Sequence, residues 1–484
     1  MRAARCEPTT CGKRAGFCPS DRSDTWMGER HRRVGDVVDD VPVGRFHWLV
    51  VAIVGGTWAA MAVSILAISF TLPTFIERWA LSGFSAGVLG SASLLGMLVG
   101  NTVGGWYADR AGRKRTLVGS IVTFSTFTAV TAFAGGVHSA VAIRFLTGIG
   151  LGGALVSGTS YLAELVPSRV RGRYVAFLEA GYSVGAVVLV IVAWVVLSVL
   201  GSPDGTVADV AAWRVFFAVG IAPIGLAVAV ARLLPPSPHF LARQGRAAAA
   251  TDALKTIAAR TGGDPSAITG PWRVADVDDI GYRRLLGPEL LGTTVLVASL
   301  WAVINLTFYG VFTWLPDTVA AAGYAENLYR FLFVVTVFQF AGQVTAAVLI
   351  EVVGRKWTLG GFTSLGGVGV LLFAGAVPGA GIDLGASRTA VFLLGLFVTG
   401  FAVLGAWAVL YAYTSEVFPT AVRSTGLGLT GSVGKVAAVA GPVFFGTLTR
   451  FGYLVALAPV AAALVLAGIA LLVFGTETRG ETLL

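Results

Sequence analysis

Long apolar runs alternate with shorter polar segments along most of this chain, beginning at Trp48. About 20 consecutive apolar residues are enough to cross the hydrocarbon core of a bilayer as one α-helix. Twelve such runs predict membrane-spanning helices at approximately 48–73, 85–107, 116–136, 139–162, 174–200, 213–234, 290–315, 328–352, 357–377, 387–412, 424–448 and 453–474. The pattern therefore predicts an all-α membrane protein with both termini on one side.

The polar segments divide these helices into two groups of six. The longest one after the N-terminus separates the sixth helix from the seventh and contains six prolines. We expect an N-terminal tail at 1–45, a six-helix bundle at 46–234, a central loop at 235–289, a second six-helix bundle at 290–474 and a C-terminal tail at 475–484. Met27 is an alternative start to Met1, since residues 1–26 contain no helix-length apolar run.

The two halves repeat each other in the loops. Tyr, Glu, Pro and Arg recur at identical spacing, as Tyr161, Glu164, Pro167 and Arg171 in the first half and Tyr413, Glu416, Pro419 and Arg423 in the second. A weaker repeat matches Asp109, Gly112 and Arg113 with Glu351, Gly354 and Arg355. Pseudo-symmetric six-helix halves are typical of secondary transporters, whose binding site lies between the halves.

Composition argues against a water-soluble enzyme. Charged residues make up 13% of the chain, hydrophobic residues 55%, and the mean hydropathy is +0.79, whereas soluble domains carry roughly 25% charged residues. The apolar helices hold no nucleophile beside a base and no metal-ligand cluster, so we expect no enzyme, metal or cofactor. The three cysteines, Cys6, Cys11 and Cys18, are interpreted as unpaired thiols in the tail because their spacing is irregular.

The positive charges predict the orientation. Of the 35 Lys and Arg residues, nine lie in the tail, nineteen in the loops on the same side, five on the opposite side and two inside helices. Cytoplasmic loops of membrane proteins carry an excess of Lys and Arg. We therefore expect a multi-pass protein of the plasma membrane with both termini and the central loop in the cytoplasm. The net charge of +9 then needs no nucleic-acid partner.

Several motifs resemble the major facilitator superfamily over about residues 46–480. The stretch from Gly104 to Arg115 is similar to the superfamily's signature loop between helices two and three. The Arg144–Gly152 segment, both Glu-x-x-Pro-x-x-x-Arg boxes, the 235–246 segment and the Thr476–Gly480 end resemble its sugar-porter-like branch, which includes organic-anion and metabolite:proton symporters. The resemblance implies two six-helix bundles that expose a central site alternately to each side.

Charged residues at the loop ends of the helices are candidates for the gate. Helix ends carry about half a unit charge, so Asp109 and Glu416 can bind helix N-termini or arginines in one gate state only. The candidate gating residues are Asp109, Arg110, Arg113, Glu164, Arg171, Glu351, Arg355, Glu416 and Arg423. The alternative is that these charges only set topology and contact headgroups.

Ionisable residues inside apolar helices are functional candidates because burying charge in lipid is costly. We identify three, namely Arg144, Glu179 and Lys435, with Glu179 as the only carboxylate in a helix body. Proton-coupled relatives often carry an acid in helix one, where this chain has Trp58 to Ala62. Glu179 and Arg144 are therefore the coupling candidates, with a proton as the candidate ion. A structural ion pair is the alternative.

The central helices favour an anionic substrate. Sugar-transporting relatives have paired glutamines in helix seven, whereas this chain offers only Asn305 among apolar and aromatic residues there. Lys435 stands where organic-anion and nicotinate-like or aromatic-acid carriers have an arginine. The predicted substrate-binding residues are Lys435, Asn305, Phe308, Tyr309, Trp407 and Tyr411. For any single aromatic, helix packing is the alternative.

We therefore expect a transporter that moves a small organic anion, such as an aromatic carboxylate, by alternating access. A carrier of sugars or polyols, or an exporter of hydrophobic compounds, is the alternative within transport. Outside transport, the chain could be a sensor that has kept the fold and lost translocation, and the uncharged helix one is the feature that favours this. The expected partners are the substrate and the lipid bilayer.

Overall fold

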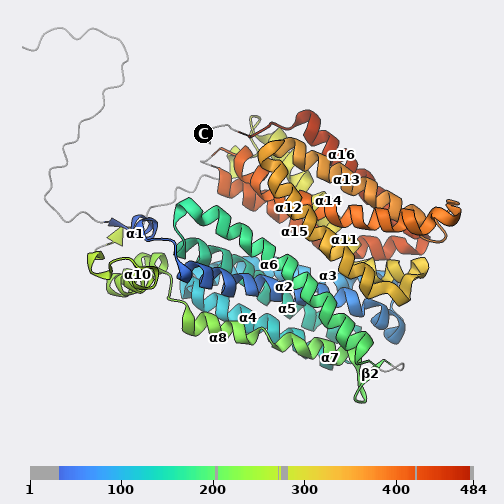
Figure 1. Ribbon diagram of the computed structural model, residues 1–484, viewed down its shortest axis with the longest axis horizontal. Helices are drawn as coiled ribbons and strands as arrows, with labels where there is room; N and C mark the ends of the chain where they lie inside the picture. Colours follow the sequence, from blue (N-terminus) through green and yellow to red (C-terminus); the bar gives the residue numbers. More distant parts are fainter. Residues whose placement is uncertain (1–31, 202–204, 271, 274–281, 420–421, 480–484) are drawn as a thin grey trace, which may run out of the picture.

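The computed structural model describes residues 32–201, 205–270, 272–273, 282–419 and 422–479. The three cysteines, Cys6, Cys11 and Cys18, lie outside these residues. Within the described part, long helices form two bundles that lie side by side (Figure 1). Eleven continuous helical stretches are long and apolar enough to span a membrane, and one of them, Leu291–Val352, contains two helices. The predicted all-α architecture of twelve spanning helices is therefore confirmed.

The first bundle contains six spans, the last of which is broken. Its helices are α2 (Arg45–Trp79), α3 (Gly83–Ala111), α4 (Arg113–Val130), α5 (Val137–Leu165), α6 (Ser168–Trp194), α7 (Ala212–Ala218) and α8 (Ile224–Leu233). Helices α7 and α8 together make the sixth span, joined through a 3₁₀ turn at Val219–Ile221. Pro223, which lacks the backbone N–H that a continuous helix requires, stands directly before α8.

The second bundle also contains six spans. Its helices are α11 (Leu291–Val319), α12 (Leu328–Val352), α13 (Arg355–Ala376), α14 (Arg388–Val417), α15 (Arg423–Leu448) and α16 (Tyr453–Phe474). Helix α11 runs past the predicted end at 315 and includes Asp317, whose carboxylate accepts a hydrogen bond of 2.7 Å from the Tyr453 hydroxyl. Glu179 is thus not the only carboxylate in a helix body, and that prediction is wrong because the apolar run ends before the helix does.

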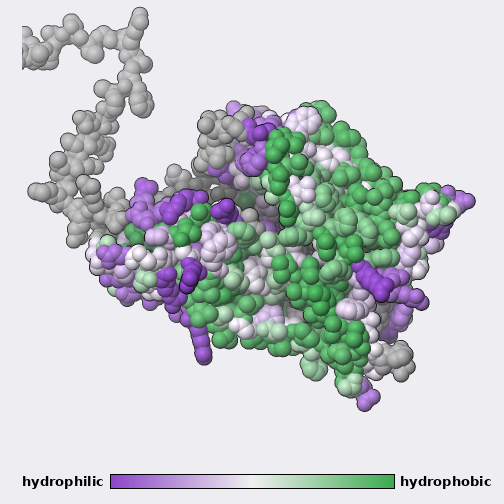
Figure 2. Space-filling view, in the orientation of Figure 1, coloured by the Kyte–Doolittle hydropathy of each residue, from purple (hydrophilic) through white to green (hydrophobic). Residues whose placement is uncertain are grey.

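Shorter elements lie at the two ends of the bundles. One end, here called the α10 face, carries α1 (Val34–Asp40), α9 (Pro238–Arg243) and α10 (Ala247–Thr261), with β1 (Arg32–Arg33) paired to β4 (Trp272–Arg273). The other end, the far face, carries the hairpin of β2 (Thr206–Val207) and β3 (Val210–Ala211). Hydrophobic side chains cover the flanks between these ends, and hydrophilic ones gather at the α10 face (Figure 2).

The residues before the first span are folded against the central loop. Strands β1 and β4 pair in parallel, and α1 shares a small apolar core with α10 that consists of Val34, Val37, Val38, Leu254, Ala258 and Ile268. Asp39 accepts hydrogen bonds from the backbone N of Ser168 at 2.5 Å and from its hydroxyl at 2.8 Å. This part of the expected tail therefore links the central loop to the start of α6.

The two bundles meet closely in the half toward the far face. A Cβ atom added to Gly87 of α3 would lie 2.6 Å from the backbone of Pro442 and Val443 in α15. Ser91 of α3 donates a hydrogen bond of 2.6 Å to the carbonyl oxygen of Val439. The approach at Gly87 requires a residue without a side chain. The structure is therefore closed between the bundles on the far-face side.

Candidate functional site

An aromatic cluster lies at the centre of the second bundle, where α11 and α14 face the first bundle. The rings of Trp301 and Tyr411 are 4.7 Å apart, and those of Phe308 and Trp407 are 5.3 Å apart. Tyr309 packs 5.0 Å from Phe308. The structure thus brings together all four predicted aromatic site residues. Trp301, which sequence reasoning did not assign to the site, belongs to the same cluster.

Two opposite charges approach this cluster from different bundles. Glu179 projects from α6 and Lys435 from α15, and they interact electrostatically. Among the residues that the structure describes, no salt bridge within 4.0 Å joins them. The indole N–H of Trp58 donates a hydrogen bond of 3.4 Å to the Glu179 carboxylate. Lys435 is therefore near an acid without being locked to it.

Asn305 is buried beside this pair on α11. Its amide nitrogen donates a hydrogen bond of 2.8 Å to the carbonyl oxygen of Trp301, while its side-chain oxygen has no partner among the described residues. Gly434, the neighbour of Lys435, packs so closely that an added Cβ would lie 2.9 Å from the Asn305 amide nitrogen. The backbone of α15 directly before Lys435 therefore packs closely against α11.

Arg144, the second coupling candidate, lies apart from this site. It is fully buried in α5, donates a hydrogen bond of 2.6 Å to the carbonyl oxygen of Ser64, and lies 5.9 Å from the centre of the Phe217 ring. Its other two guanidinium nitrogens have no partner within the described part of the chain. A cation held by a carbonyl and a ring, with no carboxylate bonded to it there, is an unusual arrangement in a membrane helix.

Six of the nine predicted gating residues form one charge cluster in each bundle at the α10 face. In the first bundle, Arg113 pairs with Asp109 at 2.8 Å and with Glu164 at 2.9 Å. Glu164 also accepts a hydrogen bond from Ser237. Arg110 stacks over Trp106 at 4.1 Å instead of pairing in this cluster.

The second cluster repeats the first one. Arg355 pairs with Glu416 at 2.9 Å and with Glu351 at 3.3 Å. Glu477 adds a carboxylate that accepts a hydrogen bond of 2.8 Å from the Arg355 backbone N. Sequence reasoning noted the Thr476–Gly480 motif but gave Glu477 no role. The sequence feature that could have identified Glu477 is an acidic residue three positions after the end of the last apolar run.

Arg171 and Arg423, the arginines of the two repeated boxes, each lie at the start of a helix. Arg171 lies in the first turn of α6 and interacts electrostatically with Asp39 of α1. Burial acts to raise the pKa of Asp39, but the hydrogen bonds from Ser168 and the charge of Arg171 outweigh it and hold this pKa below its usual value. Arg423 is the first residue of α15. The salt bridges of each charge cluster join residues of the same bundle.

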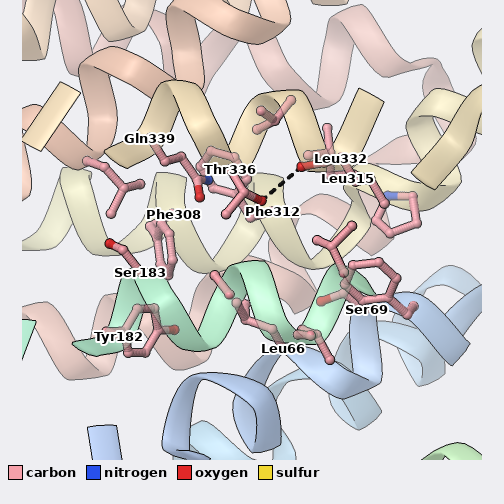
Figure 3. A pocket seen from close by; sticks show the side chains of 17 residues that line it. Leu66, Ser69, Tyr182, Ser183, Phe308, Phe312, Leu315, Leu332, Thr336 and Gln339 are labelled. Carbon is pink, nitrogen blue, oxygen red and sulfur yellow. Dashed lines mark hydrogen bonds between the residues drawn. The ribbon is translucent and has the colours of Figure 1, made fainter. Parts of the chain in front are cut away.

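A cavity of about 50 Å³ lies between the two bundles (Figure 3). It is next to the aromatic cluster, on the side of the cluster toward the far face. Its polar lining comes from three helices and consists of Ser69, Tyr182, Ser183, Thr336 and Gln339. Sequence reasoning missed all five, because single polar residues in apolar helices carry no signal of where they point. Among the described residues, no group of three His, Cys, Asp or Glu side chains could hold a metal ion.

Comparisons with known proteins agree with this architecture. The family described as "Sugar (and other) transporter" matches residues 48–484. A niacin transporter, NiaP of Acinetobacter baylyi, is 28% identical over 92% of this chain and 98% of its own length. A 4-hydroxybenzoate transporter, PcaK of Pseudomonas putida, is 25% identical over 87% and 90%.

A solved structure shares the fold. The partially occluded inward-open xylose transporter XylE from E. coli aligns with a TM-score of 0.71 and 19% identity, over 91% of this chain and 100% of that one. The match of the family over nearly all of the two bundles decides the assignment. The chain therefore belongs to the sugar (and other) transporter family within the major facilitator superfamily, and it is a secondary transporter of small organic substrates, not an enzyme.

Proposed function

We propose that this transporter carries a small planar carboxylate across the plasma membrane by alternating access. The observation that supports this most is Lys435, which interacts with Glu179 of the other bundle but forms no salt bridge within 4.0 Å among the described residues. A cation at mid-membrane is held either by an internal acid or by the charge of the cargo. An aromatic carboxylate would satisfy both Lys435 and the aromatic cluster.

The relatives support the same substrate class. Niacin and 4-hydroxybenzoate, which the names of two relatives give as cargo, are both six-membered aromatic rings with one carboxylate. A sugar would need several amides to bond its hydroxyl groups, and α11 supplies only one, Asn305. We therefore favour the carboxylate over a sugar, a hydrophobic compound or a sensor without transport.

Glu179 gives this proposal a coupling step. Lys435 interacts with Glu179 across the two bundles. When the cargo carboxylate takes Lys435, Glu179 loses its counter-charge and binds a proton, because an uncompensated buried carboxylate is costly. One proton would then cross with each anion. Arg144, which lies away from the pair, would serve to hold α5 against α2 through the Ser64 carbonyl.

The charge clusters fit a gate at the α10 face, and the excess of Lys and Arg supports a cytoplasmic position for that face. The structure is closed toward the far face, and each cluster is satisfied inside its own bundle. We propose that Asp109 and Glu416 exchange partners when the bundles close at the α10 face.

The function is tested by uptake into proteoliposomes, with labelled nicotinate, 4-hydroxybenzoate, xylose and the neutral analogue nicotinamide. We expect carboxylate uptake. Lys435→Gln should weaken carboxylate affinity about 10- to 100-fold, the range for a hydrogen bond to a charged group, while Lys435→Arg retains part of it. Nicotinamide, which has no carboxylate, should distinguish little between the wild type and Lys435→Gln.

The control is the double variant Glu179→Gln with Lys435→Gln. If Lys435 served only as a structural partner of Glu179, the double variant would recover carboxylate uptake, and the anion proposal would be rejected. Equal losses for nicotinate and nicotinamide, or uptake of xylose alone, would reject it as well.

A further inference from the structure

The cavity beside the aromatic cluster borders the proposed carboxylate site. Phe308 lines the cavity, and its ring also packs 5.3 Å from Trp407 in the cluster. On α6, Tyr182 and Ser183 follow Glu179 by three and four residues toward the far face. That spacing is about 4.5–6 Å along a helix, similar to the width of a six-membered ring. A ring whose carboxylate meets Lys435 would thus direct its other end into the cavity.

Three polar side chains that line this cavity lack a hydrogen-bond partner among the described residues, and the Tyr182 hydroxyl of α6 is one of them. Ser69 of α2 is 3% exposed, and its hydroxyl makes no hydrogen bond with any described residue. The side-chain amide of Gln339, from α12 in the other bundle, also makes none with the residues that the structure describes. Figure 3 shows Ser69 and Gln339 on opposite sides of the space.

The hydroxyl groups of Ser183 and Thr336 already make hydrogen bonds. Ser183 donates a hydrogen bond of 2.6 Å to the Gln343 side-chain oxygen. Thr336 donates one of 2.8 Å to the carbonyl oxygen of Leu332 in its own helix. A polar group that is buried without a partner costs about 1–3 kcal/mol. The unpaired groups of Ser69, Tyr182 and Gln339 would therefore gain a partner from a polar substituent that enters the cavity.

We infer that this cavity, here called the far subsite, receives one hydrogen-bonding substituent at the end of the substrate opposite its carboxylate. The inference rests on the proposed function. A volume of about 50 Å³ holds a hydroxyl group or a few water molecules, but not a ring. A phenolic hydroxyl would donate to the Gln339 oxygen and accept from Ser69. Because these residues belong to different bundles, such a substrate would also hold the far side closed.

The test compares two ligands that differ only in this substituent, benzoate and 4-hydroxybenzoate, by calorimetric binding to the purified full-length protein. We expect the wild type to bind 4-hydroxybenzoate more tightly. Ser69→Ala and Gln339→Leu should each lower the affinity ratio of the two ligands about three- to tenfold, as for one neutral hydrogen bond. Benzoate affinity should stay nearly unchanged in both variants.

Thr336→Val is the matched control, since it changes the same cavity wall but removes a hydroxyl that is already bonded within its helix. It should keep the wild-type ratio. The far subsite is rejected if the ratio is unchanged in Ser69→Ala and Gln339→Leu, if both ligands weaken equally, or if the wild type has no preference, in which case the cavity holds water only. If the wild type bound no carboxylate at all, the proposed function itself would be overturned.

Discussion

At the scale of single residues, His239 shows how the α10 face tunes a side chain outside the membrane. It lies in α9, near Gly35 of α1. Burial, together with the positive charges of Arg171 and Arg243, lowers the pKa of His239 to about 4. The His239 ring is therefore neutral at physiological pH, where it packs against α1.

This shift predicts a pH-dependent stability. Unfolded histidine has a pKa of about 6.5, so between pH 6.5 and 4 the unfolded chain binds a proton that the folded protein excludes. The contribution of His239 is fully present above pH 6.5 and is lost as the pH falls toward 4, by at most about 1.4 kcal/mol per pH unit. We expect His239→Gln to flatten the decline of the melting temperature in detergent over this window.

The exposed His138 supplies the control for this measurement. His138→Gln should leave the pH profile as it is in the wild type. A profile that is equally steep in His239→Gln and the wild type would show that other groups cause the decline.

At the scale of elements, the approach of α3 to α15 determines whether the far side can close. Because a Cβ on Gly87 would lie 2.6 Å from the α15 backbone, a larger side chain there must separate the helices. We predict that Gly87→Leu shifts the protein toward a conformation open at the far face. A cysteine at Ser69, introduced as Ser69→Cys, should then react faster with a membrane-impermeant maleimide in intact cells.

The comparison for this experiment is Gly119→Leu on α4, where no atom lies within 4 Å of an added Cβ. It should leave the labelling rate of Ser69→Cys unchanged. Equal labelling rates in the Gly87→Leu and wild-type backgrounds would mean that the α3–α15 contact does not control closure.

At the scale of the whole molecule, two residues at opposite ends of the bundles report the orientation in the membrane. Gly205 stands beside β2 at the far face, and Lys255 belongs to α10 at the opposite end. The excess of Lys and Arg predicts that the α10 face is cytoplasmic. In a cysteine-free background, an impermeant reagent applied to intact cells should label Gly205→Cys and not Lys255→Cys. The reverse pattern would invert the topology.

The sequence by itself determined the twelve spans, the two halves and the family, because each depends on a local pattern. An apolar run of 20 residues predicts a span wherever it stands, and the repeated boxes around Glu164 and Glu416 reveal the duplication without any knowledge of packing. The aromatic cluster was also within reach, since α11 carries Trp301, Phe308 and Tyr309 within three turns.

Only the tertiary structure decided which distant residues meet. Glu179 and Lys435 are 256 positions apart, and their approach depends on how two bundles pack. Likewise, nothing local to Ser69 or Gln339 shows that they share a cavity, and the folded contact of α1 with α10 is invisible in a polar tail. The physical reason is the same in each case: hydrophobicity sets which segments enter the membrane, whereas close packing between helices sets which polar side chains remain unpaired inside it.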